Sequence, residues 1–560
     1  MGARVPHRMY LRAGIIARER RRYVYQHVRV SYPRSASAHD RLQPVLDGVQ
    51  LTAAPLGPRR ISLVSSVVAL TVLVACVQFV VARGFGDPDG YYHVAMAQLF
   101  GKGTSGPAFP WLPYTLLGQH FSDQHYLYHG LLNLFLRVPH GAQWSVVAIF
   151  LAMLVVLARL LRDMGVPLVP LWLAVFTLGS SELLFRMNLV RPSVLGILLV
   201  TGVGAALYRR RLGWLFCLSL VFPLVYGGFI VLPLVVGVWE LVRMAYGAAR
   251  FPSATVLCLL GLGLGVALHP HPWEYVRYLY TQVFLASVGS PEALNAGIEW
   301  RPYGVGPFVR TNMLMLAVWM IGIVVLISEA TRENRDQSTP LVSTWLLVTS
   351  AVFCAFALVS RRFVEYWALF ALLMSAWVLA PSMRRVPWSV TGTMGRSRRP
   401  VAALGAVAVC VAIFLAGWNL DTVFAYYSAV PRYDLFHGAG QLLRSHAGAN
   451  QIVVNTQWEQ FPSLFLWNPA SAYIAGLDPR FLSARDPRRY WLWRQVADDR
   501  VAAMPARELH RIVRDEFGAG FIVIEQVRNP RLLELLDTPE GEQYFAKVFE
   551  DRGILIYRAR

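Results

Sequence analysis

The sequence predicts a polytopic α-helical membrane protein that ends in an α/β domain outside the cytoplasm. Hydrophobic residues make up 55% of its 560 residues, and charged residues make up only 15%. A soluble protein of this length cannot bury so many apolar residues, whereas membrane spans of about 20 residues each require them. The apolar runs end near residue 420, and the sequence beyond that point alternates short strand and helix patterns.

Residues 1–60 precede the apolar runs and are basic, with RERRRY at positions 18–23. They show no sustained apolar periodicity, so we expect a largely disordered cytoplasmic tail. The first apolar run is long enough to span a membrane, which does not match a cleavable signal. The net charge of +20 is concentrated in this tail and in short loops. Such a distribution indicates membrane topology and contact with anionic lipid, not nucleic-acid binding.

Residues 61–420 contain the apolar runs and form the predicted transmembrane domain, with about eleven spans. The runs lie near 62–82, 144–161, 167–182, 189–207, 212–224, 227–244, 254–269, 311–328, 341–359, 363–380 and 401–418. With the N-terminus in the cytoplasm, the short cytoplasmic loops are mostly rich in arginine, as the positive-inside rule requires. An odd number of spans in the inner membrane then places residues 421–560 on the outer side.

Two longer segments face the same outer side, at residues 83–143 and 270–310. Long loops are commonly functional or disordered, and the aromatic content of both argues against disorder. In the C-terminal domain, residues 451–455, 520–524 and 553–557 have strand patterns with helical patterns between them. This alternation predicts a small α/β domain. All five cysteines fall inside apolar runs without a CxxC pair, so neither a disulfide framework nor a zinc site is expected.

The most informative motif is Asp87-Pro88-Asp89, directly after the first predicted span. Proline fixes its own φ and favours an extended conformation in the preceding residue, so the two carboxylates lie on a stiff turn. Such a pair suits a hard divalent cation, or one of the two acts as a general base. The alternative is a helix-capping turn followed by interfacial tyrosines.

The same loop carries Asp123, His125 and His129 before an apolar helix. Asp123 is a candidate cap for this helix and a candidate metal ligand together with the Asp-Pro-Asp turn. His125 and His129 are four residues apart and share one helical face. They suit either a metal ion or hydrogen bonding to a lipid phosphate.

Two further outer segments contain acidic residues. Glu182 and Arg186 are four residues apart and are followed by Arg191, which predicts an interfacial ion pair or a second acidic contribution to the site. Glu299 lies among aromatic residues in the 270–310 segment, either in an ordinary turn or in a loop that closes over a ligand.

Arg361 and Arg362 lie at the outer end of a predicted span, against the positive-inside trend. An arginine costs about 2–3 kcal/mol at mid-membrane and less at the interface, so a compensating role is expected. The guanidinium fork grips phosphate, and the phosphate of an isoprenoid lipid lies at this depth. A structural pair with Glu365 is the alternative.

These features together resemble a class C (GT-C) glycosyltransferase, and most closely the catalytic subunit of oligosaccharyltransferase and its bacterial relatives. The string Asp87-Pro88-Asp89-Gly90-Tyr91-Tyr92-His93 is similar to the first-loop motif of that subunit, in which the acid contacts the acceptor and a divalent metal. Glu299 is similar in placement to the late outer-loop glutamate of the family, and Arg361 and Arg362 to its lipid-phosphate arginine. The resemblance implies that Tyr91, Tyr92, His93, Asp123, His125, Glu299, Arg361, Arg362 and Trp458 contact substrate.

The sequence departs from the family where the WWDYG acceptor motif is expected, since Gln457-Trp458-Glu459-Gln460-Phe461 stands there. The family's second acidic motif is also not evident. We therefore expect an extracytoplasmic acceptor other than an Asn-x-Ser/Thr peptide, such as a lipid, a polysaccharide or another glycan.

The expected activity is sugar transfer from a polyprenyl-phosphate donor, with Asp87 or Asp89 as general base or metal ligand. Mg²⁺ or Mn²⁺ held by Asp87, Asp89 and Asp123 is the expected cofactor if the enzyme uses a metal. The alternative is a non-catalytic lipid-glycan transporter or an envelope-assembly scaffold. A transporter more often has mid-span charges and inverted repeats, and neither is evident here.

Overall fold

The computed structural model describes residues 58–560 except 104–105, 282–296, 298, 300, 331–337, 386–398, 447–450 and 502–503. The chain divides into two compact units, residues 1–61 and 62–560. The expected cytoplasmic tail, 1–60, lies outside the described residues except for the first turn of helix α3. Much of the outer segment 270–310 also lies outside them.

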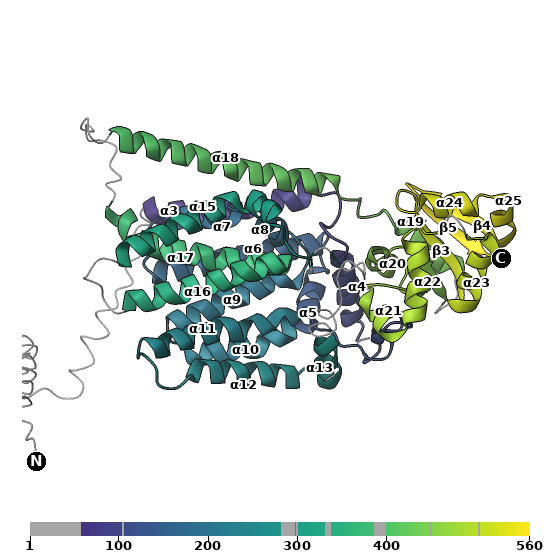
Figure 1. Cartoon of the computed structure of the whole chain (residues 1–560), viewed down its shortest axis with the longest axis horizontal. Coiled ribbons are helices and arrows are strands. Elements are labelled where there is room, and N and C mark those ends of the chain that lie inside the picture. Colours follow the sequence, from purple (N-terminus) through teal and green to yellow (C-terminus); the bar gives the residue numbers. More distant parts are fainter. Residues whose placement is uncertain are drawn as a thin grey trace, which may run out of the picture. The chain divides into compact units, whose positions relative to one another are not determined.

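The membrane part of the second unit is helical and runs as far as α18 (Figure 1). Its helices are α3 (Pro58–Cys76), α4 (Asp89–Gly101), α5 (Tyr126–Phe135), α6 (Gly141–Asp163), α7 (Val169–Leu178), α8 (Ser181–Met187), α9 (Pro192–Tyr208), α10 (Leu212–Val225), α11 (Val231–Ala245), α12 (Ser253–Ala267), α13 (Pro272–Tyr280), α15 (Val305–Ala330), α16 (Ser338–Val359), α17 (Val364–Arg385) and α18 (Arg399–Ala429).

Within the described residues, seven helices are long and apolar enough to cross a membrane, or up to nine if each of two bent helix pairs is one span. This is the pattern of a multi-pass membrane protein. Two shorter apolar helices, α9 and α10, coincide with predicted runs at 189–207 and 212–224. The expected number of eleven spans stays a prediction, because α9 and α10 are shorter than the about 20 residues that a span needs.

Helix α17 lies at the centre of the membrane part, and α18 lies along one side of it (Figure 1). In α17, 83% of the most apolar window is buried within the protein, against 11% in α18. The apolar side chains of α18 are therefore largely uncovered by the rest of the protein, as expected for a helix that faces lipid. It then continues into the C-terminal domain.

A bend between α7 and α8 and a kink in α15 bring polar residues to the end of the membrane part that adjoins the C-terminal domain. Helices α7 and α8 meet at an angle of 89°. The hydroxyl of Ser180 caps α8 by accepting a hydrogen bond from the Leu183 N–H (3.0 Å), and it donates one to Asn312 Oδ1 (2.6 Å). Asn312 itself lies at a kink in α15. The bend turns the short polar helix α8 away from the direction of α7.

The described residues of the segment 83–143 contain α4, α5 and a short 3₁₀ turn at Leu116–Gly118. It contacts the C-terminal domain through polar and apolar groups. The Trp111 indole N–H donates to the Pro469 carbonyl (2.7 Å), and the Tyr114 hydroxyl donates to the Phe517 carbonyl (2.9 Å). Phe109 packs against Phe465 in a hydrophobic core shared with the membrane part.

The C-terminal part is a mixed α/β domain with strand order β2-β1-β3-β5-β4. Strand β1 (Ile452–Asn455) is parallel to β2 (Ala472–Tyr473) and β3 (Ala519–Glu525), whereas β5 (Ile554–Ala559) is antiparallel to β3 and β4 (Phe545–Asp551). Its helices are α19 (His437–His446), α20 (Phe461–Trp467), α21 (Arg480–Arg485), α22 (Pro487–Ala497), α23 (Ala506–Arg511), α24 (Pro530–Leu536) and α25 (Pro539–Tyr544).

The predicted α/β pattern of this domain is confirmed, with two strands added. The strand patterns at 451–455, 520–524 and 553–557 correspond to β1, β3 and β5. Strand β2 has only two residues, which is too short to produce a pattern. Strand β4 lies at the sheet edge with many exposed residues, so it lacks the apolar alternation that marks a half-buried strand.

Candidate active site

A cavity of about 660 Å³ is lined by residues at the ends of the membrane helices and by residues of the C-terminal domain. The membrane part contributes eight charged side chains to its wall, namely Asp87, Asp89, Glu182, Arg186, Arg191, Glu299, Arg361 and Arg362. The C-terminal domain contributes Trp458, Glu459, Gln460, Ser463, Leu477, Asp478, Glu525 and Arg528. The volume is in the range typical of small-molecule sites.

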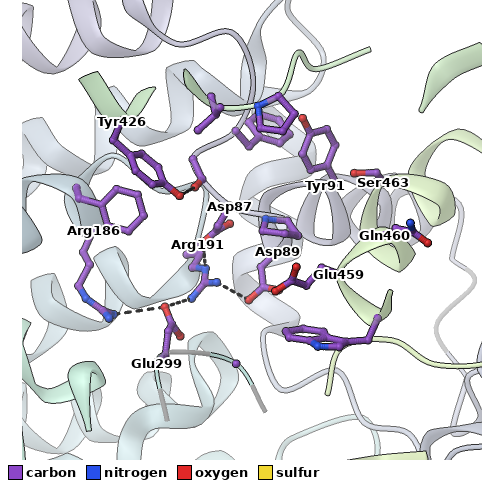
Figure 2. A pocket seen from close by; sticks show the side chains of 18 of the residues that line it. Asp87, Asp89, Tyr91, Arg186, Arg191, Glu299, Tyr426, Glu459, Gln460 and Ser463 are labelled. Carbon is purple, nitrogen blue, oxygen red and sulfur yellow. Dashed lines mark hydrogen bonds and ion pairs between the residues drawn. The ribbon is translucent and has the colours of Figure 1, made fainter. Parts of the chain in front are cut away.

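Asp87 and Asp89 lie at the start of α4 and both face this cavity (Figure 2). The Gly90 N–H donates to Asp87 Oδ1 (3.1 Å), which closes the turn over Pro88. The Tyr426 hydroxyl of α18 donates to the Gly86 carbonyl (2.9 Å) and holds the preceding backbone. The position of the two carboxylates is therefore fixed by the local turn and by α18, which is far away in the sequence.

Arg191 lies at the centre of the carboxylates (Figure 2). Its Nε pairs with Asp87 Oδ2, its Nη2 lies 2.7 Å from Asp89 Oδ2, and its Nη1 donates to Glu299 Oε1 at 2.6 Å. Arg191 caps α9 in an extended conformation, directly before Pro192. Each nitrogen of one planar guanidinium thus faces a different carboxylate.

Glu299 connects this cluster to further arginines. Its Oε1 lies 3.7 Å from Arg186 Nη1, and its Oε2 lies 3.4 Å from Arg362 Nε. The Ser360 hydroxyl donates to the Glu299 backbone carbonyl (2.8 Å), which fixes the segment next to the end of α16. Arg186 also pairs with Glu182 at 3.0 Å, as the four-residue spacing predicts.

The carboxyl groups of this cluster differ in pKa, because their surroundings differ. Burial raises the pKa of Asp87 to about 7, although Arg191 opposes the shift. Burial also raises the pKa of Asp89 against the same guanidinium. At Glu299, burial acts in the same direction, but three neighbouring guanidinium groups outweigh it and hold the pKa well below its usual range. Asp87 therefore suits proton transfer near neutral pH, whereas Glu299 stays ionised.

Arg361 and Arg362 lie in a 3₁₀ turn between α16 and α17 (Arg361–Phe363) and both line the cavity. The Arg361 guanidinium lies over the Tyr303 ring, 4.5 Å from its centroid. Tyr303 donates to Glu182 Oε2 at 3.3 Å. The alternative of a structural pair with Glu365 does not describe these contacts. Arg361 lies over Tyr303 and Arg362 faces Glu299, while Glu365 Oε2 lies 3.8 Å from Arg186 Nη1.

The C-terminal wall of the cavity combines an aromatic ring with carboxylates. Trp458 begins a 3₁₀ turn directly after β1 and lies close to Gly297. Arg528 donates to Glu459 Oε2 (2.7 Å), and the Arg480 Nε donates to Asp478 Oδ1 (2.9 Å). An indole beside fixed carboxylates is suited to bind a polyhydroxyl group through the ring face and hydrogen bonds.

The structure brings together most of the predicted site residues, since Asp87, Asp89, Tyr91, Glu299, Arg361, Arg362 and Trp458 all line this cavity. The other four do not line it. Tyr92, His93, Asp123 and His125 are buried in a neighbouring cluster.

This second cluster is a hydrogen-bonded chain. Asp123 Oδ2 lies 2.7 Å from His129 Nδ1, and His129 Nε2 lies 2.9 Å from His93 Nδ1. The His125 backbone N–H donates to Asp123 Oδ1 (3.1 Å), so Asp123 fixes the turn before α5 instead of facing Asp87 and Asp89. The His125 ring stacks on Tyr226.

The charged cluster of the cavity does not fit a divalent metal ion. Among the described residues, no group of three or more His, Cys, Asp or Glu side chains is arranged to hold one. One oxygen each of Asp87, Asp89 and Glu299 pairs with a different nitrogen of the Arg191 guanidinium, so these oxygens already have a cationic partner.

Arg191 is the main site residue that sequence reasoning did not identify as such. Its signal was an arginine directly before a proline at the start of a helix, on the same outer side as the Asp-Pro-Asp turn. Asp478, in the loop before α21, and Tyr426, in α18, were not identified either.

Comparison with solved structures shows what this fold resembles. The oligosaccharyltransferase of Archaeoglobus fulgidus, solved in the apo form, matches with a TM-score of 0.59 at 11% identity, over 89% of this chain and 74% of that one. ArnT from Cupriavidus metallidurans, solved bound to undecaprenyl phosphate, matches with a TM-score of 0.50 at 13% identity, over 88% of this chain and 97% of that one.

These likenesses confirm the predicted GT-C-like fold. Comparisons with protein-family models and with curated proteins give no match.

Proposed function

We propose that this chain is a membrane glycosyltransferase that moves a sugar from a polyprenyl-phosphate donor to an acceptor outside the cytoplasm. The observation that carries the proposal is the cavity, in which a carboxyl group with a pKa near 7 and two arginines share one wall at the outer helix ends. The fold likeness to ArnT, which was solved with undecaprenyl phosphate, supports the same class of lipid. The inner membrane, with the N-terminus in the cytoplasm, is the corresponding location.

In the proposed reaction, the acceptor hydroxyl attacks the anomeric carbon while the Asp87 carboxylate takes the hydroxyl proton. The new carbon–oxygen bond forms as the bond between the anomeric carbon and the phosphate oxygen breaks. The polyprenyl phosphate leaves with its negative charge facing Arg361 and Arg362. Asp89, on the same turn, orients the acceptor.

The acceptor would approach from the C-terminal wall of the cavity, where Trp458, Glu459 and Asp478 lie. These groups favour a polyhydroxyl acceptor, such as a glycan, over a peptide. A first test is to identify the lipid-linked sugar that accumulates in cells lacking the protein, since this sugar would be the donor. Absence of any such accumulation, with a defect in lipid-glycan export instead, would favour a transporter.

The rate of transfer should depend on pH through Asp87. A general base acts in its ionised form, so kcat/KM is expected to fall as the pH is lowered through about 7 and to level off above it. The accumulated donor and isolated membranes supply the assay. The Asp89→Asn variant should keep this pH limb, and the Asp87→Asn variant should lose it. A limb that disappears only in Asp89→Asn would reverse the two roles.

Arg361 and Arg362 should determine the affinity for the lipid phosphate. We expect the Arg361→Ala/Arg362→Ala variant to bind undecaprenyl phosphate at least about tenfold more weakly, since each charge-assisted hydrogen bond contributes about 1.5–3 kcal/mol. Binding of undecaprenyl phosphate to the protein in detergent micelles is the measurement, and undecaprenol without phosphate is the ligand control. The matched variant is Arg277→Ala, whose guanidinium lies outside the cavity and contacts His120. Equal affinities for all three proteins would exclude the phosphate role.

A further inference from the structure

The carboxylates of the candidate active site surround a cation that is part of the protein itself, the guanidinium of Arg191. Asp87, Asp89 and Glu299 come from segments far apart in the sequence, and each presents one oxygen to the same guanidinium. Carboxylate oxygens are the usual ligands of Mg²⁺ or Mn²⁺. In this protein the three oxygens lie around the guanidinium of Arg191, each beside a different nitrogen.

The second oxygens of these carboxylates are also largely engaged. Asp87 Oδ1 accepts from the Gly90 N–H at 3.1 Å, and Glu299 Oε2 lies 3.4 Å from Arg362 Nε. A metal ion would therefore have to displace backbone and guanidinium donors that now surround the carboxylates. Mg²⁺ would in addition demand near-octahedral geometry from them.

Arg191 is held by its backbone and by its surroundings. It is the extended residue before Pro192, and its side chain is only 15% exposed. Proline favours this extended conformation in the residue before it, so the direction of the side chain is set by the start of α9. Withdrawal of the guanidinium would remove the ion pairs of Asp87 and Asp89 and one of the three guanidinium groups around Glu299, which is strongly unfavourable in a largely buried site.

We infer that Arg191 is the resident cation of this site and takes the place of a divalent metal ion. The catalytic role of Arg191 rests on the proposed function. In that reaction, the guanidinium would neutralise the charge of Asp87 and Asp89 beside the leaving phosphate. A guanidinium is permanently charged and is covalently part of the chain. A chelator therefore cannot remove the cation from this site.

Binding of Mn²⁺ alone tests the inference without any sugar substrate. The full-length protein is freed of metal by a chelator in detergent micelles, and free Mn²⁺ is followed by electron paramagnetic resonance. The wild-type protein should show no saturable site that depends on Asp87. The Arg191→Ala variant should gain a saturable Mn²⁺ site. Its affinity should exceed any residual Mn²⁺ binding by the wild-type protein at least about tenfold, equivalent to about 1.4 kcal/mol. Adding Asp87→Asn or Glu299→Gln to that variant should abolish the gain.

Two further variants test whether the effect is specific to Arg191 and whether it depends on the positive charge. Arg511→Ala removes an exposed arginine that also faces two carboxylates, Glu508 and Glu516, and should gain no such site. Arg191→Lys keeps the charge and should also exclude Mn²⁺. If Arg191→Ala is unstable, Mn²⁺ should raise its melting temperature but not that of the wild-type protein.

Saturable binding to the wild-type protein that is lost in Asp87→Asn would overturn the inference, and so would a gain in Arg191→Ala no greater than in Arg511→Ala. The proposed function is tested separately by undecaprenyl phosphate binding. Failure of that binding with the expected Mn²⁺ results would remove the proposed function and leave Arg191 as the resident cation.

Discussion

Replacing Asp87 with asparagine is expected to lower the rate of sugar transfer by about 10²–10⁴-fold, the usual contribution of a positioned general base. The amide has nearly the shape of the carboxylate, and its oxygen can still accept the hydrogen bond from the Gly90 N–H. It cannot accept the proton of the acceptor hydroxyl. The affinity for undecaprenyl phosphate should change little, because the phosphate is expected at Arg361 and Arg362.

The measurement is transfer from the accumulated lipid-linked donor in membranes, normalised to the amount of folded protein. Asp434→Asn is the matched variant, because the Asp434 carboxylate, between α18 and α19, pairs with Arg432 and Arg552 and does not line the cavity. It should retain the wild-type rate. Unchanged transfer in both Asp87→Asn and Asp89→Asn would show that neither aspartate is the base.

Replacing Glu299 with glutamine is expected to have the largest effect on stability. The Glu299 carboxylate compensates three guanidinium groups in a largely buried site, and removing one partner of a buried ionic network costs about 3–5 kcal/mol. Thermal unfolding in detergent measures the effect as a lower melting temperature. Glu525→Gln is the matched variant, since Glu525 is more exposed and lies 3.4 Å from Arg528. A similar melting temperature for both variants would contradict the central role of Glu299.

The same network has a defined pH dependence. Because the folded protein holds the pKa of Glu299 well below its ordinary value of 4.5, this residue binds its proton more readily in the unfolded chain. Its contribution to stability is therefore complete above about pH 5 and is lost as the pH falls toward the folded-state pKa. The Glu299→Gln variant should lack this acid-dependent loss.

The sequence was sufficient to predict the wall of the cavity formed by the helix ends. The Asp-Pro-Asp turn, Glu299 and the arginines at 361 and 362 each stand out locally, as charges next to apolar runs. Since the positive-inside pattern assigned all of them to the outer side, their proximity followed from topology. The individual ion pairs between these residues could not be predicted in this way. Membrane topology gives the side on which a residue lies, but not which side chains pair with each other.

Arg191 shows the limit of this reasoning. It is about as far in sequence from Asp89 as from Glu299, and its local pattern differs little from that of an interfacial arginine. Its role depends on the 89° bend between α7 and α8 and on the extended residue before Pro192. No local periodicity encodes how these segments meet.

The motif Tyr91-Tyr92-His93 shows a second limit, which is geometric. Helix α4 begins at Asp89, so successive side chains are turned by about 100°. Tyr91 consequently lines the cavity, while Tyr92 and His93 face the buried cluster of Asp123 and His129. The three residues of the motif therefore lie in two different environments. The sequence alone does not predict this division, because it does not fix the residue at which the helix begins.

The charged groups of the cavity share one property of position, which is that they lie at or near the ends of helices. Asp87 precedes α4, Arg191 precedes α9, and Arg361 lies between α16 and α17. One residue added to a helix moves its end by about 1.5 Å and turns it by about 100°. The lengths of these helices therefore set both the position and the direction of each charge. Residues in the apolar interior thus shape the candidate active site without contacting it.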